Sequence, residues 1–179
     1  VYLDDGTPFH AKAGTASLST EFVTVPFEDA FDEGQPVVLT KSQTTQGIDP
    51  VVTRPAKVSR DSFDVRLQEE ALGPHGDETV GYVAFDQATG TLGGKSFEVR
   101  RPAQQVTDEW TSVAFQQQYE SPQFVADMQT FNGVDTANLR YRNLSGTGVE
   151  LRVEEEQSAD PETAHVPEDV GYAVFEGSA

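Results

Sequence analysis

The sequence predicts an all-β protein composed of two tandem antiparallel β-sandwiches of about six strands each. Short segments rich in β-branched and aromatic residues are separated by Gly, Pro, Asn and Asp along the whole chain. No segment shows a convincing 3.6-residue apolar period, which would indicate an amphipathic helix. The second half of the chain also repeats the residue order of the first half, so each half should contain the same strands.

The expected strands follow from composition and alternation. In FDVRLQ (63–68), Phe63, Val65 and Leu67 alternate with polar residues, as in a strand with one buried face. VELRVE (149–154) repeats this alternation. The other expected strands are EFVTVPF (21–27), PVVLT (36–40), GYVAF (81–85) and LRYRN (139–143). Short, evenly spaced strands of this kind are typical of an antiparallel sandwich.

The repeat is clearest in two polar segments. QTTQGID (43–49) recurs as QTFNGVD (129–135), and the same offset carries on into the residues that follow. After a short insertion in the second half, a histidine and a glutamate recur as well. The matched pairs are Arg54 and Arg140, Arg66 and Arg152, His75 and His165, and Glu78 and Glu168. We infer the tandem duplication of a unit of roughly 85–90 residues.

The repeat divides the chain into three parts. Residues 14–91 are expected to form the first sandwich and residues 92–179 the second, with the joint in the Gly/Thr-rich segment DQATGTLGG (86–94). Residues 1–13 lie outside the repeat and begin with apolar residues, so they could supply a strand to a partner. The chain starts at Val1 rather than Met, and we therefore expect an exported, processed protein or a piece of a longer one.

Charge and composition narrow the function classes. The net charge is −18, from 30 acidic and 12 basic residues, which argues against nucleic acids and anionic membrane surfaces as partners. It favours cations, neutral ligands such as sugars, or high solubility. The absence of cysteine excludes disulfides, thiol catalysis and Cys-ligated zinc. No apolar run approaches the roughly 18 residues of a membrane span, so membrane insertion is not expected.

The order of features within each unit resembles a known family. An aromatic pair precedes a proline and an apolar strand, as in VPFEDAFDEGQPVVL and SVAFQQQYESPQFVA. A polar loop with Asp, an Arg-bearing strand, an F-x-V-x-L-type strand and an aromatic strand (GYVAF or GYAVF) follow. This order resembles the H-type lectin domain over about residues 14–86 and 97–176. The resemblance implies a six-stranded antiparallel sandwich that binds galactose or N-acetylgalactosamine at subunit edges, although the tryptophan usual near the penultimate strand is absent.

The repeated loops and arginines are candidate ligand-binding residues. Gly in each loop can adopt a positive φ, and Asp can bond its own downstream backbone, so each loop is either a self-tied turn or a ligand loop. The arginines could form a cross-strand ladder with acidic residues or grip a ligand or a partner's carboxylate. The candidates are Gln43, Asp49 and Arg54, and their counterparts Gln129, Asp135 and Arg140.

Acidic residues and a histidine recur where each unit predicts a hairpin end. Carboxylates with an imidazole could hold a transition metal, and carboxylates with loop carbonyls could hold Ca²⁺. The alternative is a solvated hairpin end, in which the acids pair with histidine or with Arg66 and Arg152. No EF-hand or HExxH motif is present. The candidate metal ligands are Glu70, His75 and Glu78, and Glu156, His165 and Glu168.

These observations predict a non-enzymatic extracellular or cell-surface protein. No GxSxG motif, phosphate loop or nucleophile elbow is present. The leading hypothesis is a carbohydrate-binding adhesion protein that gains avidity as a homo-oligomer. The alternative is a structural subunit of an extracellular filament or surface layer, polymerised by sheet-edge strand donation between copies of itself. A third hypothesis is an accessory domain of a polysaccharide-degrading enzyme.

Overall fold

The computed structural model describes residues 1–32, 34–69, 75–158 and 160–177. Over these ranges the protein is all-β, with 13 strands in four antiparallel sheets and no helix, so the all-β part of the prediction is confirmed. The described residues accordingly include no helix long and apolar enough to cross a membrane.

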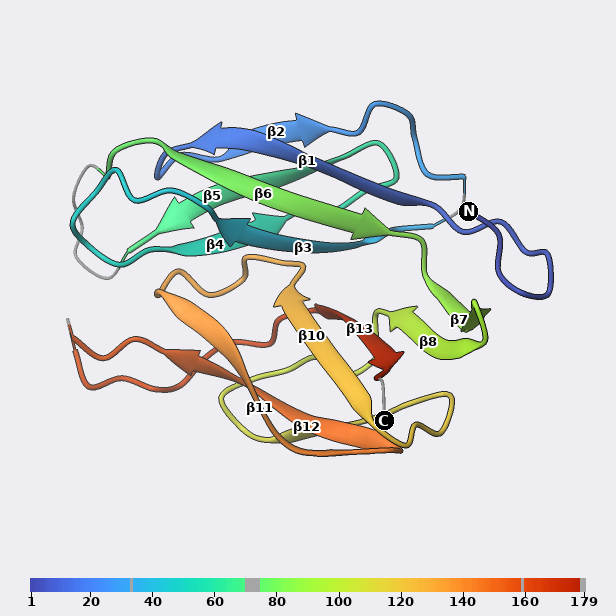
Figure 1. Cartoon of the computed structure of the whole chain (residues 1–179). Helices are drawn as coiled ribbons and strands as arrows, with labels where there is room; N and C mark the ends of the chain where they lie inside the picture. Colours follow the sequence, from blue (N-terminus) through green and yellow to red (C-terminus); the bar gives the residue numbers. More distant parts are fainter. Residues whose placement is uncertain (33, 70–74, 159, 178–179) are drawn as a thin grey trace.

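The first half of the chain forms two three-stranded sheets, in the upper part of Figure 1. One has the order β1-β6-β3, and the other β2-β5-β4. The strands are β1 (Ala11–Leu18), β2 (Val23–Pro26), β3 (Val37–Ser42), β4 (Val52–Ala56), β5 (Ser62–Gln68) and β6 (Glu78–Phe85).

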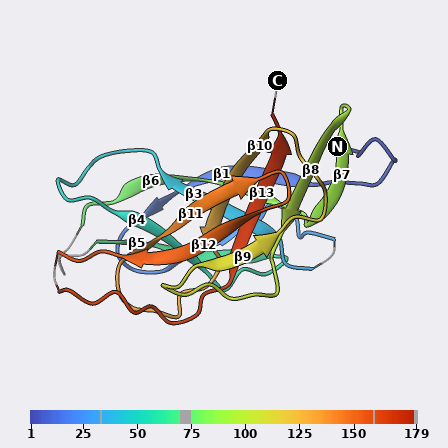
Figure 2. The same ribbon diagram turned by 90° about the horizontal axis from the view of Figure 1, so that it is seen from below.

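The second half repeats this topology with one strand added. Its sheets have the orders β10-β13-β8-β7 and β11-β12-β9, so β8, β13 and β10 take the places of β1, β6 and β3. Figure 2, viewed from below, looks onto the β11-β12-β9 sheet. The strands are β7 (Ala88–Leu92), β8 (Lys95–Arg100), β9 (Thr111–Ala114), β10 (Pro122–Met128), β11 (Ala137–Ser145), β12 (Gly148–Glu155) and β13 (Val170–Glu176).

Each half has its own hydrophobic core between its two sheets. Phe63, Val65 and Leu67 of β5 pack with Val38 and Val80 of the other sheet, as the alternation predicted. In the second half, Val149, Leu151 and Val153 of β12 pack in the same way against β13. Burial of each such side chain contributes about 1.5–3 kcal/mol.

A third apolar cluster joins the two halves and includes the start of the chain. Leu3 and Phe9 are buried there together with Val37 of β3 and with residues of β8 and β13. Residues 11–13 belong to β1, which pairs with β6 of the same chain. The segment 1–13, expected as a possible donor strand, is therefore used within its own chain, because its apolar residues find a buried site there.

The segment 86–94, expected as the joint between the halves, contains β7. This strand pairs with β8 through a turn at Gly93 and Gly94, whose φ angles are 59° and 75°. Both values lie in the left-handed region that glycine adopts without steric cost. The Asp4 carboxylate accepts a bond of 2.9 Å from each of these two glycine amides. The Gly/Thr-rich sequence thus encodes a hairpin, whose turn glycines obscured the strand.

Candidate functional site

Glu78 anchors the loop QTTQGID (43–49) in the first half. The Thr44 hydroxyl donates to one carboxylate oxygen, and the amides of Gln46 and Gly47 donate to the other at 2.5 and 3.1 Å. His75 Nε2 lies 3.2 Å from that second oxygen. These donors, the Thr44 hydroxyl first among them, lower the pKa of Glu78 to about 2.

Glu168 anchors the loop QTFNGVD (129–135) of the second half in the same way. It accepts bonds from the Thr130 hydroxyl and, at 2.9 and 3.1 Å, from the amides of Asn132 and Gly133. His165 Nε2 lies 3.2 Å from the same oxygen as the two amides. The repeated segments 43–49 and 129–135 are therefore loops whose backbone amides donate hydrogen bonds to a buried glutamate.

The glycine of each loop is required by the histidine, and neither glycine has a positive φ. A Cβ atom on Gly47 would lie 2.1 Å from Cε1 of His75, and one on Gly133 would lie 2.3 Å from Cε1 of His165. Any side chain at these positions would push the imidazole away from the anchoring glutamate.

Each histidine also meets a glutamate at the end of the strand that precedes it in the chain. The predicted hairpin is wrong at both places, because β5 and β6, like β12 and β13, belong to different sheets. His75 Nδ1 lies 3.4 Å from Glu69, and His165 Nδ1 lies 2.6 Å from Glu155. Of the predicted alternatives, Glu156 is exposed, and Glu70 lies outside the described residues. The period-2 alternation of β5 and β12 could have indicated this choice, because Glu69 and Glu155 continue the buried faces of their strands.

These clusters have little capacity left for a metal ion. Both imidazole nitrogens lie next to carboxylates, and both oxygens of Glu78 and Glu168 already accept hydrogen bonds. Within the described ranges, no three His, Asp or Glu side chains are grouped to hold a metal. The clusters are suited to fixing a loop: although burial lowers the pKa of His165, its bonds to Glu168 and Glu155 raise it overall, which favours a charged imidazolium.

Arg54 links the two halves of the molecule. It projects from β4 of the first half, is fully buried, and donates to Glu168 of the second half at 3.1 Å. It also donates to the Asp135 carbonyl at 2.9 Å and to the Gln68 side chain at 2.7 Å. Its guanidinium lies over the Phe131 ring, 4.6 Å from the centroid. Arg54, a candidate ligand-binding residue in the sequence, thus binds the loop 129–135 of the other half.

Gln129 and Asp127 complete this contact. The buried Gln129 amide accepts from the Val38 amide at 2.9 Å and donates to the Val38 carbonyl at 2.8 Å. Asp127 accepts bonds from the amide and hydroxyl of Thr40 at 3.0 and 2.7 Å. Burial raises the pKa of Asp127 to about 7, against the effect of these bonds.

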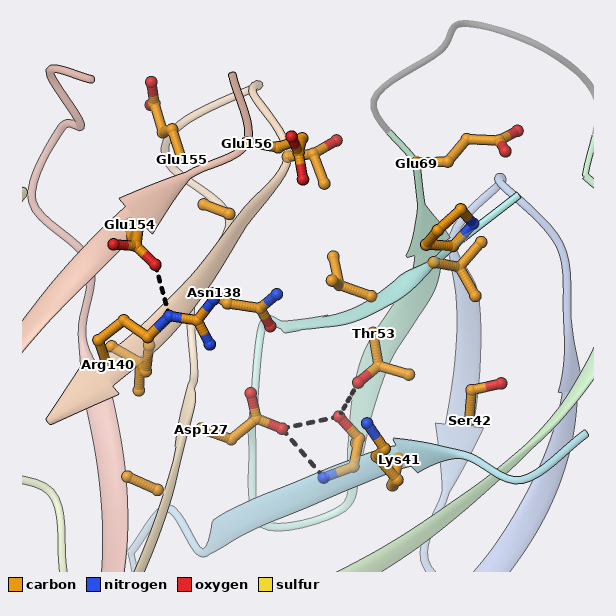
Figure 3. Close-up of a pocket in the computed structure, with 18 of the residues that line it drawn as sticks. Lys41, Ser42, Thr53, Glu69, Asp127, Asn138, Arg140, Glu154, Glu155 and Glu156 are labelled. Carbon is orange, nitrogen blue, oxygen red and sulfur yellow. Dashed lines mark hydrogen bonds and ion pairs between the residues drawn. The ribbon is translucent and has the colours of Figure 1, made fainter. Parts of the chain in front are cut away.

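A groove of about 750 Å³ lies between the halves, lined by β3 and β4 on one side and β10, β11 and the end of β12 on the other. Asp49 lines it. So do Arg140, Lys41 and Asn138, which are labelled in Figure 3. Arg140 is exposed and pairs with Glu154 at 2.5 Å. The groove is polar on both walls, and several of its side chains are free to meet solvent.

The predicted ligand residues thus separate into two groups. Arg54 and Gln129 are buried in the contact between the halves, to which Asp135 adds its carbonyl, whereas Gln43, Asp49 and Arg140 are exposed. Asp127, Thr40 and Gln68 were missed because they fall outside the repeated pattern: Lys41, Ala126 and Glu154 occupy the matching positions. No feature of the sequence indicates that Arg54 is buried and Arg140 is exposed.

The comparisons with known proteins point to a large relative. The chain is 33% identical to halomucin of Haloquadratum walsbyi over 181 residues, an alignment that covers 98% of this chain and 2% of halomucin. This chain thus spans only a small part of the length of the relative it matches. No family model matches the chain, and no solved structure matches it.

Proposed function

We propose that this chain is a non-enzymatic structural module of a large extracellular protein. In this proposal, the two halves, β1 to β6 and β7 to β13, are tandem sandwiches locked into one stiff body. The observation that carries it is the fully buried Arg54, which reaches from one half into the anchored loop of the other and bonds to Glu168. Separating the halves would take Glu168 and the carbonyls of Gly133 and Asp135 away from the buried Arg54 guanidinium, so this contact resists motion of the halves.

The alignment supports the same proposal. Almost the whole chain aligns with a very small fraction of halomucin, as expected for one module of a long protein. The relative's name and its source, Haloquadratum walsbyi, support an extracellular place in a salty medium, where an acidic surface is screened by counter-ions.

The coupling of the halves can be tested by calorimetry. The wild-type chain is expected to unfold in one cooperative transition. Arg54→Met removes one partner of a buried pair, so it should lower the free energy of unfolding by about 3–5 kcal/mol and separate the halves into two transitions. Arg140→Met is the matched control, because this arginine is exposed, and it should change the free energy by no more than about 0.5 kcal/mol.

Two results would reject the stiff module. One is a wild-type chain whose halves melt independently. The other is an Arg54→Met variant that behaves like Arg140→Met.

We also propose carbohydrate as a ligand of the groove, in line with the resemblance to H-type lectins. The volume of the groove and the hydrogen-bonding groups of Asp49, Asn138 and Arg140 support a polar ligand of this size. A glycan array, with and without Ca²⁺, is the direct test. Sugar binding should disappear in Arg140→Ala and persist in Arg60→Ala, which removes an exposed arginine elsewhere; an array without any bound glycan would rule out this ligand.

A further inference from the structure

The contact between the halves joins two different faces. The first half contributes what we call the arginine face: Arg54, Arg66, Phe22 and the outer side of β3. The second half contributes the loop face: the loop 129–135, Glu168 and the outer side of β13. Because the halves share one topology, each also carries a copy of the face that the other one uses. A contact between unlike faces of equivalent units can continue from unit to unit.

The second half carries a copy of the arginine face. Arg140 stands at the position of Arg54, Arg152 at that of Arg66, and Trp110 at that of Phe22. Arg66 lies over the Phe22 ring at 5.4 Å, and Arg152 lies over the Trp110 ring at 4.8 Å, so the cation–aromatic pair is preserved. The difference is exposure: the Arg140 side chain is 57% exposed and the Arg54 side chain 0%.

The first half carries a copy of the loop face. Glu78 holds the loop 43–49 through the same donors as Glu168, except that Glu168 also accepts from Arg54. Among the described residues, no arginine reaches Glu78. Gln43 lies over Gly81 as Gln129 lies over Gly171, but Gln43 is exposed, whereas Gln129 bonds the backbone of the other half.

Apolar residues flank both copies. Val125 and Phe175 match Leu39 and Phe85 of the cluster between the halves, and they are 46% and 38% exposed. On the loop face, Val83 matches the buried Ala173 and is 37% exposed. Each open face therefore has a charged centre and an apolar margin, as the closed contact has.

We propose that these two open faces bind each other, so that the first half of a second copy of this chain docks on the second half of this one and extends a head-to-tail array. Arg140 enters the loop 43–49 of the incoming copy and pairs with its Glu78. The Asp127–Thr40 bonds have no counterpart, because Lys41 and Ala126 stand at the matching positions, so the new contact is weaker than the internal one. This inference rests on the proposed role as a structural module.

Sedimentation equilibrium of the purified chain tests the proposal. The measurement is made in about 1 M salt, where a Debye length of about 3 Å screens the repulsion between copies with a net charge of −18. In a protein with tandem units, units on short linkers meet at millimolar effective concentrations, so a contact that joins them must have a Kd of about 1 mM or tighter. The wild-type chain should therefore associate reversibly with a Kd in this range. Arg140→Ala should weaken association at least tenfold, and Arg60→Ala, an exposed arginine outside both faces, should leave it unchanged.

A mixing experiment tests whether the contact joins unlike faces. The double variant Gln43→Ala/Val83→Lys disables the loop face and keeps the arginine face, whereas Arg140→Ala does the reverse. Each variant alone should be monomeric, and an equimolar mixture should form dimers that grow no further, because one live face of each kind remains.

Three outcomes would overturn the array: a wild-type chain that stays monomeric at about 1 mM, variants that associate like the wild type, or a mixture that stays monomeric. A monomeric wild-type chain with a single unfolding transition would reject the array and leave the stiff module intact. Independent melting of the halves would reject the module itself.

Discussion

Glu78 and Glu168 hold equivalent loops with equivalent donors, and each is seated against a histidine that in turn meets a second glutamate. The two halves therefore share the hydrogen bonds and the His–Glu contacts of this site as well as the fold of the loop. The glycine of each loop, Gly47 or Gly133, is also needed, because the histidine ring occupies the space that a side chain at this position would fill.

Gly133→Ala should therefore destabilise the protein. The added Cβ would meet the His165 ring at 2.3 Å, and the ring is confined by Glu155 and Glu168. We expect a loss of about 1–3 kcal/mol in the free energy of unfolding, measured by urea titration. Gly76→Ala is the control, since its nearest neighbour would be 3.7 Å away; equal losses in the two variants would contradict this account.

Asp127 makes stability depend on pH in a defined direction. Its folded-state pKa of about 7 lies above the ordinary value of 3.8, so the folded state binds the proton more tightly than the unfolded state. Its contribution is complete below the ordinary value and is lost as the pH rises through about 7. Asp127→Asn keeps an acceptor for the Thr40 amide and cannot ionise. Relative to the wild type, this variant should gain stability as the pH rises from 3.8 to about 7 in urea titrations; parallel pH profiles would refute the assignment.

The strands and segments of this chain differ in how well their sequences predicted them. β12 and β5 show the alternation of half-buried strands, and both formed where expected. The segment around β7 was harder to interpret, because its Gly93–Gly94 turn resembles a linker in composition. The N-terminal segment also reads as free in sequence, yet it packs on β3 and β8 across the junction.

Phe9→Ala tests the role of this segment. Phe9 is buried and contacts the Phe97 ring at a centroid distance of 5.0 Å. Its truncation should cost about 3–5 kcal/mol in calorimetry, as for other buried phenylalanines. Tyr2→Ala, at a side chain that is 70% exposed, should cost little. A Phe9→Ala variant as stable as the wild type would mean that the segment is not docked in solution.

The whole molecule is strongly acidic, with a net charge of −18, and the groove between its halves contains further carboxylates, including Glu154, Glu155 and Glu156. Self-repulsion on this scale opposes the compact state unless counter-ions screen it. The buried Arg54 offsets only a local part of this charge, next to Glu168.

Salt should therefore stabilise the folded chain. Raising the ionic strength from about 0.01 M to about 1 M shortens the Debye length from about 30 Å to about 3 Å, which weakens repulsion between surface carboxylates. The Tm should rise with NaCl and then level off as screening is completed. Equal Tm values in dilute and concentrated salt would show that surface repulsion is unimportant for this fold.

Sequence alone determined the all-β class, the principal strands and the duplication, because alternation, β-branched residues and turn residues are local signals. It also predicted that His75 lies near Glu78 and His165 near Glu168, because the two residues of each pair are three positions apart in the chain. Tertiary structure alone decided which of the two equivalent arginines is buried. Arg54 and Arg140 are equivalent in the repeat, but one is buried and the other exposed, because burial depends on which unit lies beside the strand and not on the strand's own sequence.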